Sequence, residues 1–134
     1  MCKLGDIIVV EDFIGDGEND VSRHSFIVIS DEGGTIAGLD YDLVTTVISS
    51  FKDEKQRKKK LSYEGNMELP ADAIKGKNLK KPSYTKADQA HYFNKDKLNY
   101  YVFGSLRGEY MDELMKLILK LASDGKLKQI VDNL

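Results

Sequence analysis

Two apolar runs separated by a glycine-rich break define the class of fold that this chain can adopt. Residues 26–29 read FIVI and residues 43–48 read LVTTVI, and both runs are dense in β-branched residues. Such side chains pack well on a pleated surface, and turn formers bound both runs, so both predict strands. Their apolar character is too continuous for strands that are solvated on one face, which predicts the central strands of a small sheet or barrel.

The rest of the chain predicts further strands followed by helices. The two central strands are expected over 25–30 and 42–51, and other strands over 4–12, 35–39, 60–63, 66–69, 83–93 and 100–106. A long amphipathic helix is predicted over 108–122 and a shorter one over 126–134, because apolar residues recur there at helical spacing. A single helical turn capped by Asn94 is expected at 94–98.

This order predicts one mainly β domain over residues 1–134, a small, partly open barrel or sheet with its helices on one side. No run of about 18 apolar residues occurs, so no transmembrane helix is expected. A single cysteine, Cys2, leaves no internal disulfide to form and fits a reducing cytosol. We therefore expect a cytoplasmic location.

Charge is unevenly distributed along the chain. The formal net charge of −2 gives no indication of a nucleic-acid partner. The segment 51–60 is nevertheless strongly basic, and because it lacks an apolar face it is expected to be a solvated connector rather than a helix. An acidic chain can still present such a local basic rim to a polyanion. The cations of this segment beyond Lys52 are Lys55, Arg57, Lys58, Lys59 and Lys60.

The sequence predicts neither a metal site nor a cofactor. Two histidines and one cysteine cannot form a zinc site without carboxylates at motif spacing. The expected loop 13–22 alternates Asp16, Glu18 and Asp20, but it lacks the glycine and the closing acid of a calcium loop. Gly33–Gly34 lacks the lysine and the spacing of a phosphate-binding loop, and Gly15-x-Gly17 is not followed by an expected helix.

Polar residues that flank the two apolar runs suit phosphodiester cleavage without a metal. RNA can be cut by its own 2′-hydroxyl if a base takes that proton, an acid protonates the leaving oxygen and a cation stabilises the charged phosphorane. His24 can act as base or acid near neutral pH, and Arg23 can bind a phosphate through two N–H groups. Ser49 and Ser50 can donate hydrogen bonds to phosphate oxygens. The alternative is that Arg23 and His24 simply begin a strand and that the serines end one.

Several segments also match one known family in order and spacing. LGDIIVV at 4–10, RHSFIVIS at 23–30 and the strand that ends at Ser50 look like an opening strand, an RRPxLVIS strand and a strand ending in Thr or Ser. SYTKADQ at 83–89 followed by NKDKL at 94–98 is similar to S(Y/F)VxxDQIRTIDKxRL, and GSL at 104–106 is similar to GxL. Together these segments resemble the MazF/PemK (Kid-like) toxins of bacterial type II toxin–antitoxin systems.

This resemblance implies an SH3-like (CcdB/PemK-type) barrel with terminal helices and a homodimer. It implies a sequence-specific endoribonuclease that needs no metal and is blocked by a cognate antitoxin protein. The family's catalytic Arg falls on Arg23 or His24, and its catalytic Thr or Ser falls on Ser49, with Ser50 adjacent. In the segment that follows Gln89, His91 replaces an arginine that suits RNA contact.

We therefore expect an endoribonuclease toxin that cleaves single-stranded RNA. Its expected catalytic residues are Arg23, His24, Ser49 and Ser50, and its expected substrate-binding residues are Lys55, Arg57, Lys58, Lys59, Gln89 and His91. Two other interpretations stay open: a non-catalytic module on the same barrel that binds nucleic acid or protein, and a different small hydrolase that uses His24 or His91. Convergence of Arg23, His24 and Ser49 in one concave pocket would favour the enzyme, whereas scattered positions would favour the module.

Overall fold

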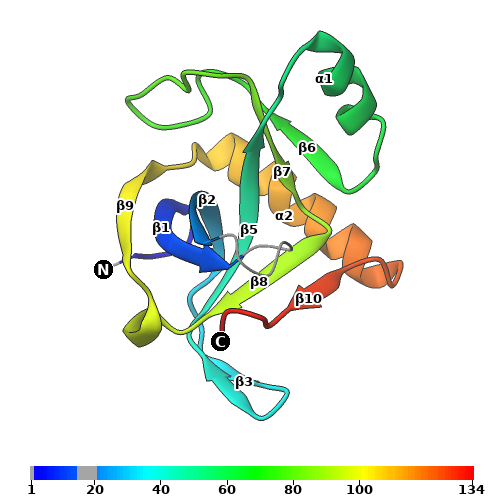
Figure 1. Cartoon of the computed structure of the whole chain (residues 1–134). Helices are drawn as coiled ribbons and strands as arrows, with labels where there is room; N and C mark the ends of the chain where they lie inside the picture. The colour runs from blue at the N-terminus through cyan, green and yellow to red at the C-terminus, as the bar shows by residue number, and fades with distance from the viewer. Residues whose placement is uncertain (1, 15–20) are drawn as a thin grey trace.

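The structure, a computed structural model, describes residues 2–14 and 21–134. Its centre is a strongly curved sheet with one long helix, α2 (Gly108–Ser123), across one face (Figure 1). The main path of the sheet runs in the order β10-β8-β5-β2-β1-β9. These strands are β1 (Asp6–Ile14), β2 (Val21–Ser30), β5 (Leu43–Ser50), β8 (Gln89–Phe93), β9 (Tyr100–Ser105) and β10 (Lys128–Ile130).

Two more strands extend this sheet at one end of β5. β7 (Ser83–Lys86) pairs with the last residues of β5, whereas β8 pairs with its first residues. β6 (Asn66–Leu69) then pairs with β7. In the described part of the chain no pairing joins the edge strands β9 and β10, so the sheet is open. The mainly β fold with a long C-terminal helix is thus confirmed.

The continuous apolar runs are buried on both faces of the sheet, as predicted. Successive side chains of a strand point to opposite faces, and Phe26, Ile27 and Val28 are all fully buried. On one face, Ile7, Ile27 and Ile29 pack with Leu114, Ile118 and Leu121 of α2. On the other face a second core fills the curve of the sheet, and it includes Ile8, Val10, Phe26, Val28, Leu43 and Phe93.

The lysine-rich segment is a helix, which corrects the expected connector and the expected strand at 60–63. α1 (Glu54–Leu61) has no buried residue and projects from the sheet (Figure 1). Its stability comes from its ends: the Asp53 carboxylate accepts a hydrogen bond from the Gln56 amide at 2.8 Å, Glu54 lies in the first turn, and lysines lie in the last. Acid at the N-terminus and base at the C-terminus of a helix complement its dipole.

The expected helix over 126–134 is also wrong. Lys128–Ile130 forms β10, which adds in parallel to β8. The apolar spacing of Leu127, Ile130 and Val131 fits a helix, but the edge of β8 offers unpaired backbone groups that a strand satisfies. The Lys128 amide donates to the Asp88 carbonyl at 2.7 Å at the start of this addition.

The shorter elements agree with the sequence more closely. The expected strand at 35–39 is a hairpin of β3 (Gly34–Ile36) and β4 (Leu39–Tyr41) that turns at Ala37 and Gly38, with φ of 52° and 78°. The helical turn is the 3₁₀ helix η1 (Lys95–Lys97), capped by Asn94. β1 and β2 extend into the expected loop 13–22, whose acids Asp16, Glu18 and Asp20 lie outside the described residues. Within residues 2–14 and 21–134 no helix is long and apolar enough to span a membrane.

Candidate functional site

The register between β2 and β5 separates the expected catalytic residues into two groups. Ser25 lies opposite Ile48 and Phe26 lies opposite Val47. Continued outward, this register sets His24 opposite Ser49 and Arg23 opposite Ser50. Because side chains alternate between the faces of a sheet, each pair occupies a different face.

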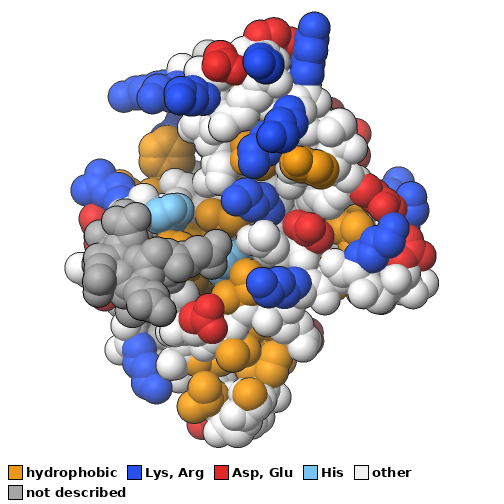
Figure 2. Space-filling view, turned by 45° about the vertical axis from the view of Figure 1, so that its right-hand side comes forward, with side chains coloured by type: hydrophobic (Ala, Val, Ile, Leu, Met, Phe, Trp, Pro, Cys, Tyr) orange, Lys and Arg blue, Asp and Glu red, His pale blue; other side chains and the backbone are white. Residues whose placement is uncertain are grey.

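His24 and Ser49 line one pocket of about 150 Å³, together with Gln89 and His91. We call it the histidine pocket. Its remaining lining residues are Phe13, Val47, Lys86, Lys128, Ile130 and Asp132. Figure 2 shows histidine surface next to hydrophobic side chains, with Lys and Arg side chains nearby. Four of the expected site residues, from three different strands, are therefore brought together.

Aromatic packing holds both histidines of the pocket. The Phe13 ring centroid lies 4.8 Å from that of His24 and 5.6 Å from that of His91. The Phe26 ring contacts His91 from another side, at 5.4 Å. A shift in the pairing of β1 between Val10 and Phe13 precedes this contact, and such irregularities redirect a side chain. His91 is 5% exposed, whereas His24 is partly open to solvent.

The charged groups of the pocket come from the ends of strands. Lys86 ends β7, Lys128 begins β10, and Asp132 follows β10. Two lysines against one carboxylate leave an excess of positive charge beside the two imidazoles and the Ser49 hydroxyl. This combination can transfer protons and neutralise a phosphate. Among the described residues no cluster of His, Cys, Asp and Glu side chains could hold a metal ion.

Arg23 and Ser50 line a different site on the opposite face of the sheet. This groove has a volume of about 470 Å³ and also contains Tyr101 and Phe103 of β9. We call it the aromatic groove. The Arg23 side chain is largely exposed, and its Nε donates to Glu11 Oε2 at 3.0 Å. The structure therefore does not bring Arg23, His24 and Ser49 into one concave pocket.

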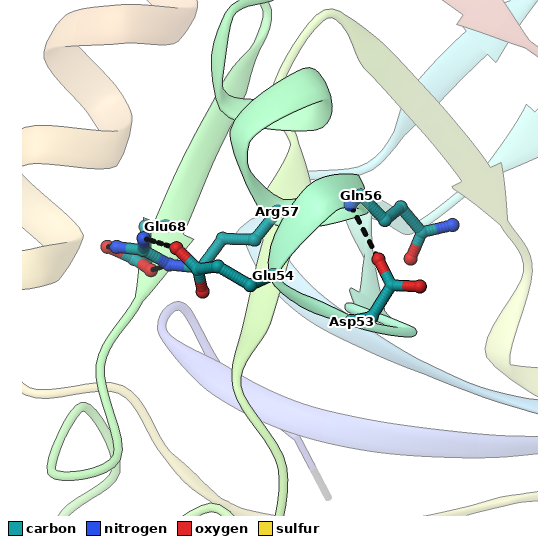
Figure 3. A network of polar contacts seen from close by, with 5 residues as sticks. All are labelled: Asp53, Glu54, Gln56, Arg57 and Glu68. Carbon is teal, nitrogen blue, oxygen red and sulfur yellow. Dashed lines mark hydrogen bonds and ion pairs between the residues drawn. The ribbon is translucent and has the colours of Figure 1, made fainter.

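None of the substrate-binding residues expected on α1 lines the histidine pocket. Lys55, Lys58 and Lys59 are exposed. Arg57 instead binds within the chain: Nε lies 2.6 Å from Glu68 Oε2, and Nη2 lies 2.9 Å from Glu68 Oε1 (Figure 3). Its Nη1 also donates to Glu54 Oε1 at 3.1 Å. The hydrogen bond and charge of Glu68 raise the pKa of Arg57 above its ordinary value.

Sequence reasoning missed Phe13, Lys86, Lys128 and Asp132 as pocket residues. Lys86 lies within the SYTKADQ segment (83–89) of the family resemblance and was the one with a usable signal. Lys128 and Asp132 were hidden by the expectation of a helix, and Phe13 by the expectation of a loop. Comparisons of the chain with models of known protein families and with curated proteins found no match.

Proposed function

We propose that this protein is a metal-independent endoribonuclease of the MazF/PemK type, which cleaves single-stranded RNA in the histidine pocket. The observation that carries this proposal is that His24, Ser49, Gln89 and His91 line one pocket beside two lysines. The curved, mostly antiparallel sheet with its C-terminal helix supports an SH3-like barrel as the fold type.

The proposed reaction is transfer of the phosphate within the RNA. The 2′-oxygen forms a bond to the adjacent phosphorus while the bond from phosphorus to the 5′-oxygen breaks. One imidazole takes the proton of the 2′-hydroxyl and the other donates a proton to the 5′-oxygen. The products are a 2′,3′-cyclic phosphate and a 5′-hydroxyl end, and no metal takes part.

The other pocket residues bind and orient the phosphate. Lys86 and Lys128 neutralise charge that develops on its oxygens. The Ser49 hydroxyl donates a hydrogen bond to one of them, and Gln89 binds a base or sugar edge. In this arrangement His24 takes the place of the family's catalytic Arg, because His24 and not Arg23 shares the pocket with Ser49. Arg23 and Ser50 contact RNA outside the reacting phosphate.

The proposal also covers the location, the oligomeric state and the protein partner. It includes a cytoplasmic location, a homodimer and a cognate antitoxin protein that blocks cleavage. The exposed lysines of α1, Lys55, Lys58 and Lys59, contact the RNA away from the reacting group.

The test is to incubate the purified protein with a long single-stranded RNA in a chelator and to map the new ends. Discrete cuts that leave 5′-hydroxyl ends are expected. His24→Gln should lower the rate roughly 10²- to 10⁴-fold, the usual effect of losing a general acid or base. Lys86→Ala should slow cleavage, whereas Lys116→Ala, which removes one exposed lysine from α2, should not. RNA that stays intact with folded protein, or a full rate in His24→Gln, would overturn the proposal.

A non-catalytic module that binds RNA is the second candidate. The observation in its favour is that Arg23 lies apart from His24 and Ser49, in a groove with exposed aromatic rings. The same experiment separates the two candidates, because a module would bind the RNA and leave it uncut.

A further inference from the structure

The aromatic groove has the composition of a site for a flexible, charged, ring-bearing ligand. Ile7 and Val9 of β1 and Ile48 of β5 contribute apolar surface. Tyr101 and Phe103 of β9 both line this groove. The two residues are 45% and 38% exposed, which leaves ring surface for a ligand to cover.

The charged residues that line this groove are basic, and one of them, Arg23, also binds Glu11. Arg23, Lys80 and Lys81 line it, and none of the described residues that line it is acidic. A fourth cation, Lys77, places its Nζ 4.4 Å from the centre of the Phe103 ring. Ser25, Ser50 and Asn78 add polar groups between the cations. Apolar floor, exposed rings and a basic rim together fit a polyanion with stacking bases.

We propose that the aromatic groove binds a single-stranded flank of the RNA substrate, outside the cleaved phosphodiester. Bases stack on Tyr101 and Phe103, and the phosphates between them contact Arg23, Lys80 and Lys81. This inference rests on the proposed function only for the identity of the RNA as a substrate.

The end of β5 connects the two sites. Ser49 lines the histidine pocket and the next residue, Ser50, lines the aromatic groove. A third depression contains Ser50 and Lys81 together with Lys52 and Gln56, so it continues the groove toward α1. An RNA strand that leaves the histidine pocket beside Ser49 can therefore pass over Ser50 and meet lysines on both sides of it.

The first measurement is fluorescence anisotropy of a labelled oligo(U) RNA. Its length of about a dozen nucleotides is within the range that a single-strand-binding domain covers. The double variant Tyr101→Ala/Phe103→Ala should weaken binding roughly tenfold or more, as loss of base stacking does. Tyr101→Phe keeps the ring and should bind normally. Val102→Ala, an exposed apolar change between the two rings, is the matched control and should bind as the parent does.

A second variant tests the charges without touching the rings. Lys80→Ala/Lys81→Ala should lower the dependence of log Kd on log salt by about 1.4, the value for two phosphate contacts on a single strand. Circular dichroism and thermal unfolding establish that each variant is folded. An unchanged Kd and salt dependence in both double variants would overturn the inference.

Cleavage separates this inference from the proposed function. Binding that depends on Tyr101 and Phe103, with no cleavage by the parent protein, would retain the groove and reject the nuclease. Cleavage with an unchanged Kd in Tyr101→Ala/Phe103→Ala would retain the nuclease and reject the groove. Loss of a dimer in that variant, without any change in Kd, would make the groove an interface between copies and also reject the inference.

Discussion

Arg57 and Glu68 form a two-bond fork that joins α1 to β6, with nitrogen–oxygen distances of 2.6 and 2.9 Å. Because α1 buries no residue, its attachment depends on polar contacts such as this one. The Asn66 side-chain amide adds a bond to the Lys60 carbonyl at 2.8 Å. Arg57 thus directs its charge inward, to position the helix, while the neighbouring lysines remain exposed.

Two roles of Arg57 predict opposite effects of Glu68→Ala on RNA binding. If Arg57 positions α1, Glu68→Ala should loosen the helix, speed amide exchange over residues 57–61 and weaken RNA binding. If Arg57 contacts phosphate directly, the same variant should free its charge and strengthen binding. We expect the first outcome, and we expect the exchanged pair Arg57→Glu/Glu68→Arg to restore protection of α1. Glu113→Ala, which removes an exposed acid of α2 and leaves α1 untouched, is the control.

A pair of leucines on α2 tests the core beneath the sheet. Leu114 is fully buried against Ile7 and Ile27, whereas Leu119 is 65% exposed. Leu114→Ala should lower the free energy of unfolding by about 2–5 kcal/mol, because it removes buried methyl groups and leaves a cavity. Leu119→Ala should change it by less than about 0.5 kcal/mol. Urea unfolding measures both, and equal losses would contradict the packing described for α2.

Glu64 predicts a dependence of stability on pH. Its Oε2 accepts from Lys126 Nζ at 2.8 Å, and this bond, with the charge of Lys126, lowers the pKa of Glu64 below its ordinary value of 4.5. A lowered folded-state pKa gives stability that is present above pH 4.5 and is lost as the pH falls through the folded-state value. The difference in Tm between the parent and Glu64→Gln should therefore shrink in acid. Glu32→Gln, at an exposed acid, is the control and should show no such trend.

The same ion pair also predicts how stability changes at high pH. Glu64 raises the pKa of Lys126 above 10.5, so the contribution of the pair persists through neutral pH and is lost only as the pH rises through that raised value. A Tm difference between the parent and Glu64→Gln that stayed constant from acid to neutral pH would show that the Glu64–Lys126 ion pair contributes nothing to stability.

His91 gives a test that separates chemistry from packing. His91→Phe keeps an aromatic ring against Phe13 and Phe26. We expect thermal stability close to that of the parent, while cleavage falls roughly 10²-fold or more because an acid–base group is lost. Full activity in a folded His91→Phe protein would limit His91 to a structural role.

The central strands and α2 could be predicted because burial leaves a strong periodic pattern. The continuous apolar runs at 26–29 and 43–48 indicate strands that are buried on both faces. The spacing of Leu114, Ile118 and Leu121 indicates a helix with one buried face. α1 could not be predicted this way, since its stability comes from Asp53, Arg57 and the charge order of its ends rather than from burial. β10 has only three residues, and its pairing depends on the free edge of β8, which no local pattern records.

The set of residues that meet in the histidine pocket was predicted in part, and strand geometry explains why Arg23 is not among them. Arg23 and His24 are neighbours in sequence, so they look equally able to join Ser49. Neighbouring side chains of a strand point to opposite faces. Only the register between β2 and β5 therefore decides whether Arg23 or His24 lies beside Ser49. Alternation alone predicts that Arg23 and His24 cannot both face one pocket. To tell which of the two faces Ser49, the register of β2 with β5 must be known.

β10 gives the histidine pocket an order of assembly. Lys128 and Ile130 form one wall of the pocket, yet they follow every other strand and α2 in the chain. A growing polypeptide therefore contains both histidines before it contains the residues of the last wall and the second lysine of the pocket. If the proposed cleavage needs that wall, a chain that ends before Lys128 should leave RNA uncut.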